Sequence, residues 1–312
     1  MDDKQFFDEN GYIIKRAFAS PEECRGMIDR MRHLIDAWDP DQTKLSVFFA
    51  DEGQESAQGN DAYFLSSSDK IHFFVERGAV DPETKTLRSD VPKHESLNKV
   101  GHGLHTLDDV FRAYSTSPKV TELAHTLGWK NPVLPQSMYI FKQRLIGDTV
   151  TSHQDSTFLH TEPRLTCLGL WLALEDATLD NGCLWVRPGS HKEGLRRVFT
   201  RNPEYFEKKN YDAPMMTFRD VGTPAAMAAA PWEHKIPTPD PQSAGFIPAP
   251  MKAGDLFVIH GEVDHLSLPN RSPVGRQTFQ LHLIEGPKEG ITWSSGNWLQ
   301  TPGKEFLGLY NF

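Results

Sequence analysis

Two short segments, far apart in the sequence, constrain how this chain can fold. His153 and Asp155 flank Gln154, and His265 follows much later in the chain, with Arg276 after it. In an extended strand, residues two apart point to the same face, so the first two side chains can bind one ion together. A third ligand from a distant strand would complete two imidazoles and one carboxylate, and three adjacent coordination positions would stay open. This ligand set is typical of non-haem Fe(II) oxygenases, and it requires the two segments to converge.

Arg276 points to a second ligand. It lies eleven residues after His265, a spacing that lets the chain turn and return alongside the metal site. A guanidinium is planar and permanently charged, and it binds a carboxylate through two parallel hydrogen bonds. The cosubstrate 2-oxoglutarate needs such an anchor, because its 2-oxo acid end chelates iron while its other carboxylate lies further away. Ser267 could add a hydroxyl to that carboxylate.

Alternation along residues 276–283 predicts a strand with two chemically different faces. One face carries Arg276, Thr278, Gln280 and His282, whereas the other is mostly apolar. A strand of this kind fits the wall of a barrel whose interior holds a charged ligand. An ordinary half-exposed edge strand has the same period and is the alternative.

The order of the expected elements indicates an α+β protein that is mainly β. Ser20-Pro21-Glu22-Glu23 predicts a helix start with a capping box, and apolar residues at helical spacing follow it. After Pro135 the chain reads as short strands separated by turns, at residues 136–142, 165–174, 183–186, 256–260 and 277–284. We therefore expect N-terminal helices that buttress a jelly roll.

Residues 201–250 differ from the rest of the chain, because they contain nine prolines and show little periodicity. So short a segment could hardly bury a core of its own, which argues against a second domain. We expect one domain over residues 1–312, in which this segment forms a lid-like insertion over the mouth of the barrel.

Composition excludes several classes of partner. The formal net charge is −9 and the pI is about 5.8, whereas a general nucleic-acid binder needs a basic excess. No apolar run reaches the roughly 18 residues of a membrane span, and the N-terminus does not resemble a signal peptide. The three cysteines are too few and too scattered for a disulfide framework. We expect a soluble protein of the cytoplasm or the peroxisomal matrix, although its last three residues are not a peroxisomal tripeptide.

Further motifs extend the pattern over nearly the whole chain, from Gly11 to Leu299. They comprise residues 136–142, His153-Gln154-Asp155, Trp171, residues 175–185, Pro188-Gly189-Ser190-His191 and the pair His265 and Arg276. Together they resemble the phytanoyl-CoA dioxygenase family, and most closely its subgroup of phytanoyl-CoA dioxygenase domain-containing proteins. The resemblance implies a double-stranded β-helix that binds Fe(II) and 2-oxoglutarate.

The resemblance also implies site residues and a reaction. Carried over by matching position, the metal ligands would be His153, Asp155 and His265, and the residues that bind 2-oxoglutarate would be Lys99, Met138, Trp171, Ser267 and Arg276. The implied enzyme is a 2-oxoglutarate-dependent dioxygenase that consumes O2 and releases succinate and CO2, with ascorbate as a further candidate cofactor. Its implied substrate is a fatty acyl-CoA, such as phytanoyl-CoA, that is hydroxylated at the 2-position.

Three alternatives stay open. The substrate could be a small metabolite without CoA. A cupin-like enzyme could use zinc or manganese for hydrolysis or isomerisation, although such chemistry has no need of Arg276. The chain could also be a metal-binding jelly roll without turnover. Five cations could meet CoA phosphates or could form a solvated basic loop; they are Arg187, Lys192, Arg196, Arg197 and Arg201.

The other histidines are better explained by structural roles. His102 and His105 have the spacing of metal ligands, but the irregular segment around them is a poor support for a second metal. His191 follows a Pro-Gly-Ser turn, which favours a local hydrogen bond. We prefer His265 to the nearby His260 because only His265 matches the family position.

Overall fold

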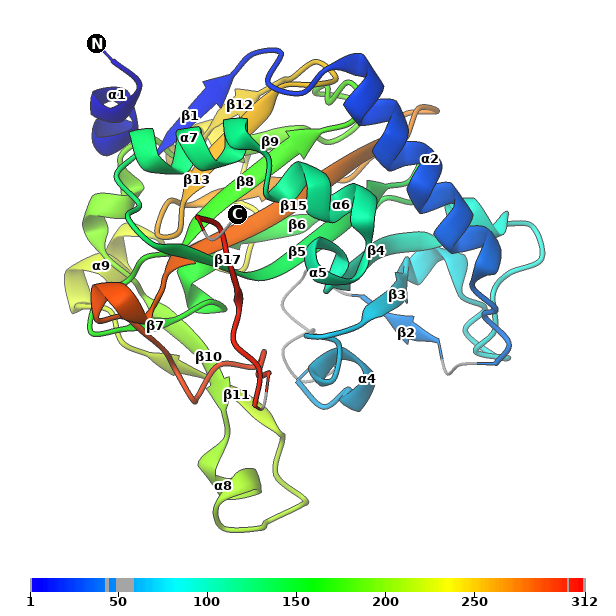
Figure 1. Cartoon of the computed structure of the whole chain (residues 1–312). Helices are drawn as coiled ribbons and strands as arrows, with labels where there is room; N and C mark the ends of the chain where they lie inside the picture. The colour runs from blue at the N-terminus through cyan, green and yellow to red at the C-terminus, as the bar shows by residue number, and fades with distance from the viewer. Residues whose placement is uncertain (1, 43–44, 49–58, 302, 311–312) are drawn as a thin grey trace.

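The computed structural model describes residues 2–42, 45–48, 59–301 and 303–310, so the C-terminal tripeptide lies partly outside it. A large sheet dominates the fold, with the strand order β1-β13-β8-β15-β5-β4-β3-β2 and with β17 paired to β5 (Figure 1). Its strands are β1 (Tyr12–Lys15), β2 (Ser46–Val47), β3 (Ile71–Val75), β4 (Leu97–His102), β5 (Pro132–Lys142), β8 (Leu168–Ala173), β13 (Leu256–His260), β15 (Arg276–Glu285) and β17 (Leu307–Gly308).

A smaller sheet lies across a cavity from the large one, and residues of both sheets line that cavity. Its order is β12-β9-β14-β6, and its strands are β6 (Val150–His153), β9 (Leu184–Val186), β12 (Ile247–Ala249) and β14 (His265–Ser267). Two short pairs complete the strands: β7 (Thr161–Glu162) with β16 (Thr292–Trp293), and β10 (Arg197–Arg201) with β11 (Met216–Asp220). The expected α+β, mainly β jelly roll is confirmed.

Helices cover the outer face of the large sheet (Figure 1). They are α2 (Pro21–Ala37), α5 (Leu104–Leu107), α6 (Asp109–Ser115) and α7 (Pro118–Thr126), and the helices elsewhere are α1 (Asp3–Asn10), α4 (Ala62–Leu65), α8 (Pro203–Phe206) and α9 (Pro224–Ala229). No helix in the described part of the chain is both long and apolar enough to cross a membrane.

The start of α2 has the predicted capping box. The Ser20 hydroxyl accepts a hydrogen bond from the Glu23 N–H at 3.2 Å, and the Glu23 carboxylate accepts one from the Ser20 N–H at 2.7 Å. From this start, the helix presents Met27 and Met31 to the core, where both are buried. Each such buried side chain contributes roughly 1.5–3 kcal/mol. The helix therefore fixes the outer layer against the sheet.

Strand β15 has the two faces that its alternation predicts. Phe279, Leu281 and Leu283 are fully buried in the core beneath the helices. Gln280 and His282 line the cavity on the opposite face. The alternative of a half-exposed edge strand is wrong, because β15 lies between β8 and β5 in the interior of the sheet.

The proline-rich residues 201–250 contain more regular structure than their sequence suggests. They begin at the end of β10, include α8, β11 and α9, and finish in β12, which pairs with β9 of the smaller sheet. The β10–β11 hairpin extends away from the barrel in Figure 1. That this segment acts as a lid stays a prediction.

Candidate metal and cosubstrate site

Three side chains from two strands converge in the cavity between the sheets. His153 ends β6 and His265 begins β14, and the two residues are opposite each other in the antiparallel pairing of these strands. Gln154 keeps an extended backbone, with φ −113° and ψ 131°, before Asp155 opens a 3-10 turn. The side chains of His153 and Asp155 therefore share a face, although β6 itself ends at His153. One ligand atom from each of the three residues lies within 4.8 Å of the others.

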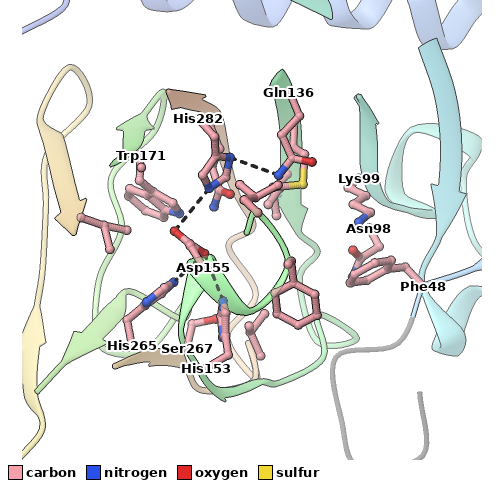
Figure 2. Close-up of a pocket in the computed structure, with 18 of the residues that line it drawn as sticks. Phe48, Asn98, Lys99, Gln136, His153, Asp155, Trp171, His265, Ser267 and His282 are labelled. Carbon is pink, nitrogen blue, oxygen red and sulfur yellow. Dashed lines mark hydrogen bonds and ion pairs between the residues drawn. The ribbon is translucent and has the colours of Figure 1, made fainter. Parts of the chain in front are cut away.

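Backbone hydrogen bonds fix the tautomer of both imidazoles. His153 donates from Nδ1 to the Thr151 carbonyl at 2.8 Å, and His265 donates from Nδ1 to the Val263 carbonyl at 3.1 Å. The lone pair of each ring is therefore on Nε2, and each Nε2 lies 3.6 Å from Oδ1 of Asp155. Figure 2 shows the two rings and the carboxylate pointing toward one another.

The protonation states suit a cation. Burial, reinforced by the neighbouring imidazole, lowers the pKa of His153 to about 4, so the ring is neutral near pH 7. Burial alone would raise the pKa of Asp155, but the three imidazoles that face it outweigh burial and hold this pKa well below its usual range. Metal ligands must be deprotonated in this way. Two imidazole nitrogens and one carboxylate oxygen form the donor set of a ferrous ion, so these residues fit the metal that the ligand pattern implies.

Arg276 lines the same cavity and is buried, with an exposed fraction of 3%. Its Nε and Nη2 donate to the Gly182 carbonyl at 3.2 and 2.8 Å, and its guanidinium lies 5.1 Å from the ring of Trp171. Its Nη1 is buried and has no hydrogen-bond partner in the described part of the chain. A buried donor without a partner costs free energy, so the site is suited to an anion that would complete it.

Lys142 is a second cation that lines this cavity, and the sequence did not single it out. It is opposite Arg276 in the pairing of β15 with β5, and its Nζ donates to the Ser267 hydroxyl at 2.8 Å. Burial, reinforced by the charge of Arg276, lowers the pKa of Lys142 to about 7. Because the Ser267 oxygen accepts from Lys142, its own proton is free to donate to an anion. The signal for Lys142 was its alternation with Gln136, Met138 and Ile140 on the cavity face of β5.

The remaining predicted residues line this cavity as well. Met138 and Trp171 are on its large-sheet wall, and Lys99 projects from β4. The Lys99 ammonium lies 3.4 Å from the centroid of the Phe48 ring and has no hydrogen bond or ion pair with a described residue. Burial lowers the pKa of Lys99 well below its ordinary value. All eight side chains that the sequence predicted thus surround one cavity.

The histidines that were set aside lie elsewhere or serve the fold. His105 is satisfied on both ring nitrogens, by the Ser137 hydroxyl and the Leu134 carbonyl. His260 packs against Phe7 and accepts from the Glu262 N–H outside the cavity. His102 borders the cavity, but the described residues hold no metal-binding cluster other than His153, Asp155 and His265.

Two of the five cations between Arg187 and Arg201 neither face solvent nor are free to bind CoA phosphates. Arg196 is completely buried, and it forms ion pairs with Glu233 at 2.8 Å and with Asp264. Arg187 also binds Asp264, at 2.6 Å, and binds Glu193. These guanidiniums are therefore neither free to meet phosphates nor solvated. Sequence reasoning missed this because the acidic partners Glu233 and Asp264 are distant in the chain.

Fold and site together define a 2-oxoglutarate-dependent dioxygenase. The family model described as Phytanoyl-CoA dioxygenase (PhyH) matches residues 7–278. Phytanoyl-CoA dioxygenase domain-containing protein 1 of Mus musculus is 42% identical, over 98% of this chain and 96% of its own. Phytanoyl-CoA dioxygenase 1 of Oryza sativa subsp. japonica is also 42% identical, over 95% and 92%. The chain belongs to the phytanoyl-CoA dioxygenase family.

Solved structures support the fold alone. The epimerase SnoN, crystallised in complex with Fe3+, alpha ketoglutarate and nogalamycin RO, is similar to this chain with a TM-score of 0.60. The two sequences are 15% identical, and the match covers 98% of this chain and 96% of SnoN. The two proteins therefore share the jelly-roll architecture although most of their side chains differ.

Proposed function

We propose that this protein hydroxylates an apolar substrate, with Fe(II) held by His153, Asp155 and His265 and with 2-oxoglutarate and O2 as cosubstrates. When bound, the metal and the keto acid supply the oxidising chemistry, with succinate and CO2 as co-products. The observation that carries the proposal is the pairing of a His–Asp–His set with the unpartnered Nη1 of Arg276 in one buried cavity.

The protein's own contribution is binding and orientation. Arg276 would receive the far carboxylate of 2-oxoglutarate through Nη1, since its other nitrogens are held by Gly182. Ser267 would donate its hydroxyl proton to the same carboxylate, and Lys142 behind it would add positive charge. The cosubstrate would lie against Lys99, Met138 and Trp171, which line the cavity. Such preorganised donors cost no rearrangement when the anion binds.

Aromatic side chains from distant parts of the chain support an apolar substrate. They surround the rest of the cavity and are Phe48, Phe64, Phe158, Phe199, Phe218 and Trp298. Their walls would exclude water and accept a hydrocarbon chain. A fatty acyl-CoA such as phytanoyl-CoA, hydroxylated at its 2-position, fits this environment and the names of the relatives.

Residues 201–250 take part in this proposed substrate pocket. Phe218 of β11 and His234 line the cavity, and the His234 N–H donates to the Ser152 carbonyl next to His153 at 2.7 Å. We infer that the segment covers the mouth of the barrel and helps to select the substrate. The positions of Phe218 and His234 support the lid that the sequence predicts.

A small metabolite without CoA is the second candidate. The observation in its favour is that Arg187 and Arg196 are held in buried ion pairs, so they are not available to CoA phosphates.

Two measurements test the proposal in order. Anaerobic titration with Fe(II) and 2-oxoglutarate should produce the visible charge-transfer band of a chelated keto acid, and absence of the band would refute the iron and keto-acid site. Succinate release is then compared between phytanoyl-CoA and free phytanic acid. Faster release with phytanoyl-CoA supports the acyl-CoA substrate, equal acceleration by both shows that CoA is not recognised, and no acceleration by either refutes this substrate class.

A further inference from the structure

His282 lies directly behind the metal-binding carboxylate. It projects from β15 into the cavity, and its Nε2 lies 3.3 Å from Oδ2 of Asp155. On the other side of the ring, Nδ1 lies 3.2 Å from Nε2 of Gln136 (Figure 2). His282 and Gln136 are both buried, each with an exposed fraction of 4%. The large sheet thus contacts the candidate metal ligands through a two-residue chain of hydrogen bonds.

The direction of these hydrogen bonds follows from Asp155. A carboxylate that binds a metal is deprotonated, so its oxygens can only accept hydrogen bonds. His282 must therefore donate from Nε2, which leaves the lone pair on Nδ1. That lone pair accepts from the amide group of Gln136. The tautomer of His282 is fixed from both sides, as in the carboxylate–histidine contacts that orient ligands in known metal sites.

The backbone leaves room for this contact at one glycine. His282 is opposite Gly169 on β8 and opposite Gln136 on β5 in the sheet register. A Cβ on Gly169 would lie 3.0 Å from Oδ2 of Asp155 and 3.6 Å from Nε2 of His282. The first distance is tighter than almost all real contacts of a Cβ. Three neighbouring strands therefore shape this contact: β15 carries His282, β5 carries its partner Gln136, and β8 leaves space at Gly169.

We propose that His282 is a positioning residue. Its hydrogen bond occupies Oδ2 of Asp155 and leaves only Oδ1 to bind the metal. Oδ1 is the oxygen that lies 3.6 Å from Nε2 of both His153 and His265. A carboxylate that bound through both oxygens would close one of the three positions that the His–Asp–His set leaves open. By holding Oδ2, His282 therefore keeps all three positions open, and it also fixes the orientation of Asp155. This inference rests on the proposed iron site.

The test compares metal affinity in variants that keep or remove the donor. Chelator-stripped wild type, His282→Leu and His282→Gln are titrated with Mn(II) by calorimetry, without 2-oxoglutarate. His282→Leu should weaken Mn(II) binding by roughly 10- to 100-fold, the usual effect of losing such a supporting contact. His282→Gln, which can still donate to Oδ2, should recover most of the loss. Gln280→Leu is the matched control, because Gln280 shares the strand and the cavity face but has no hydrogen bond to Asp155.

The outcomes separate positioning from a general effect on folding. Wild-type Mn(II) affinity in His282→Leu overturns the proposal, and so does equal weakening in the Leu and Gln variants when their thermal midpoints match wild type. If His282→Leu does not fold, Gln136→Leu decides: several-fold weaker binding supports the proposal, and wild-type affinity overturns it. Mn(II) binding without any keto-acid band in wild type would defeat the proposed function, while the effect of His282 on the metal would still be measured.

Discussion

Replacing Arg276 with alanine should separate cosubstrate binding from metal binding. The guanidinium contacts Gly182 and Trp171 and makes no hydrogen bond or ion pair with His153, Asp155 or His265, so Fe(II) affinity should stay near wild type. The affinity for 2-oxoglutarate should fall steeply, because the variant leaves a buried carboxylate without its counter-ion. Arg276→Lys keeps the charge but loses the planar fork, and it should be intermediate.

The expected size of the loss follows from burial. Arg276 is 3% exposed, so solvent screens its interaction with an anion only weakly. Removing one partner of a buried charge pair costs roughly 3–5 kcal/mol. At about 1.4 kcal/mol for each factor of ten, this predicts a dissociation constant for 2-oxoglutarate that rises roughly 100- to 4,000-fold. The Gly182 carbonyl also loses its donors, which destabilises the fold in both the free and the bound state and largely cancels in the binding constant.

The assay is the visible band of the Fe(II)–keto acid complex, titrated anaerobically with 2-oxoglutarate, beside a separate metal titration. Arg271→Ala is the matched control, because this nearby arginine is exposed and donates to the Leu145 carbonyl outside the cavity. It should leave both constants unchanged. Equal losses of metal and keto-acid affinity in Arg276→Ala, or a change of less than tenfold for 2-oxoglutarate, would refute the assigned role.

Three further predictions follow from other contacts. Gly169→Ala places a Cβ 3.0 Å from the metal-binding carboxylate, so Mn(II) affinity should fall while the thermal midpoint changes little, and unchanged affinity would contradict the geometry. The pKa of Lys142 is lowered to about 7, so its positive charge is present below that pH and lost above it. The affinity for 2-oxoglutarate should therefore fall as the pH rises through 7, and the slope should flatten in Lys142→Met; an unchanged slope would argue against Lys142. Ser20→Ala should lower the free energy of unfolding by roughly 0.5–2 kcal/mol in urea, whereas Ser117→Ala should not, because the Ser117 side chain makes no cap bond.

Local patterns in the sequence predicted much of the fold. The capping box at Ser20 and the alternation along β15 depend on neighbours in the chain, so both could be read without coordinates. The His–Asp–His set was also accessible, because its ligand types and spacing carry the chemistry. The extended backbone that this spacing requires runs through Gln154, and Asp155 then opens a 3-10 turn.

The missed features all depend on partners that are distant in the chain. His282 was placed on the correct face, but its contact with Asp155 crosses the barrel. Lys142 gains its role from Arg276 on the adjacent strand and from Ser267 on the other sheet. The basic residues were misinterpreted because charge along a segment does not reveal which carboxylates will neutralise it.

The ion pairs of Arg196 restrict how this enzyme can diversify. Arg196 joins Glu233, inside residues 201–250, to Asp264, which directly precedes His265. Exchange of residues 201–250 for the segment of a homologue would leave the buried Arg196 guanidinium without its Glu233 partner, unless the new segment brought its own acid. Any exchange of this segment, in nature or in the laboratory, therefore has to supply one carboxylate for Arg196.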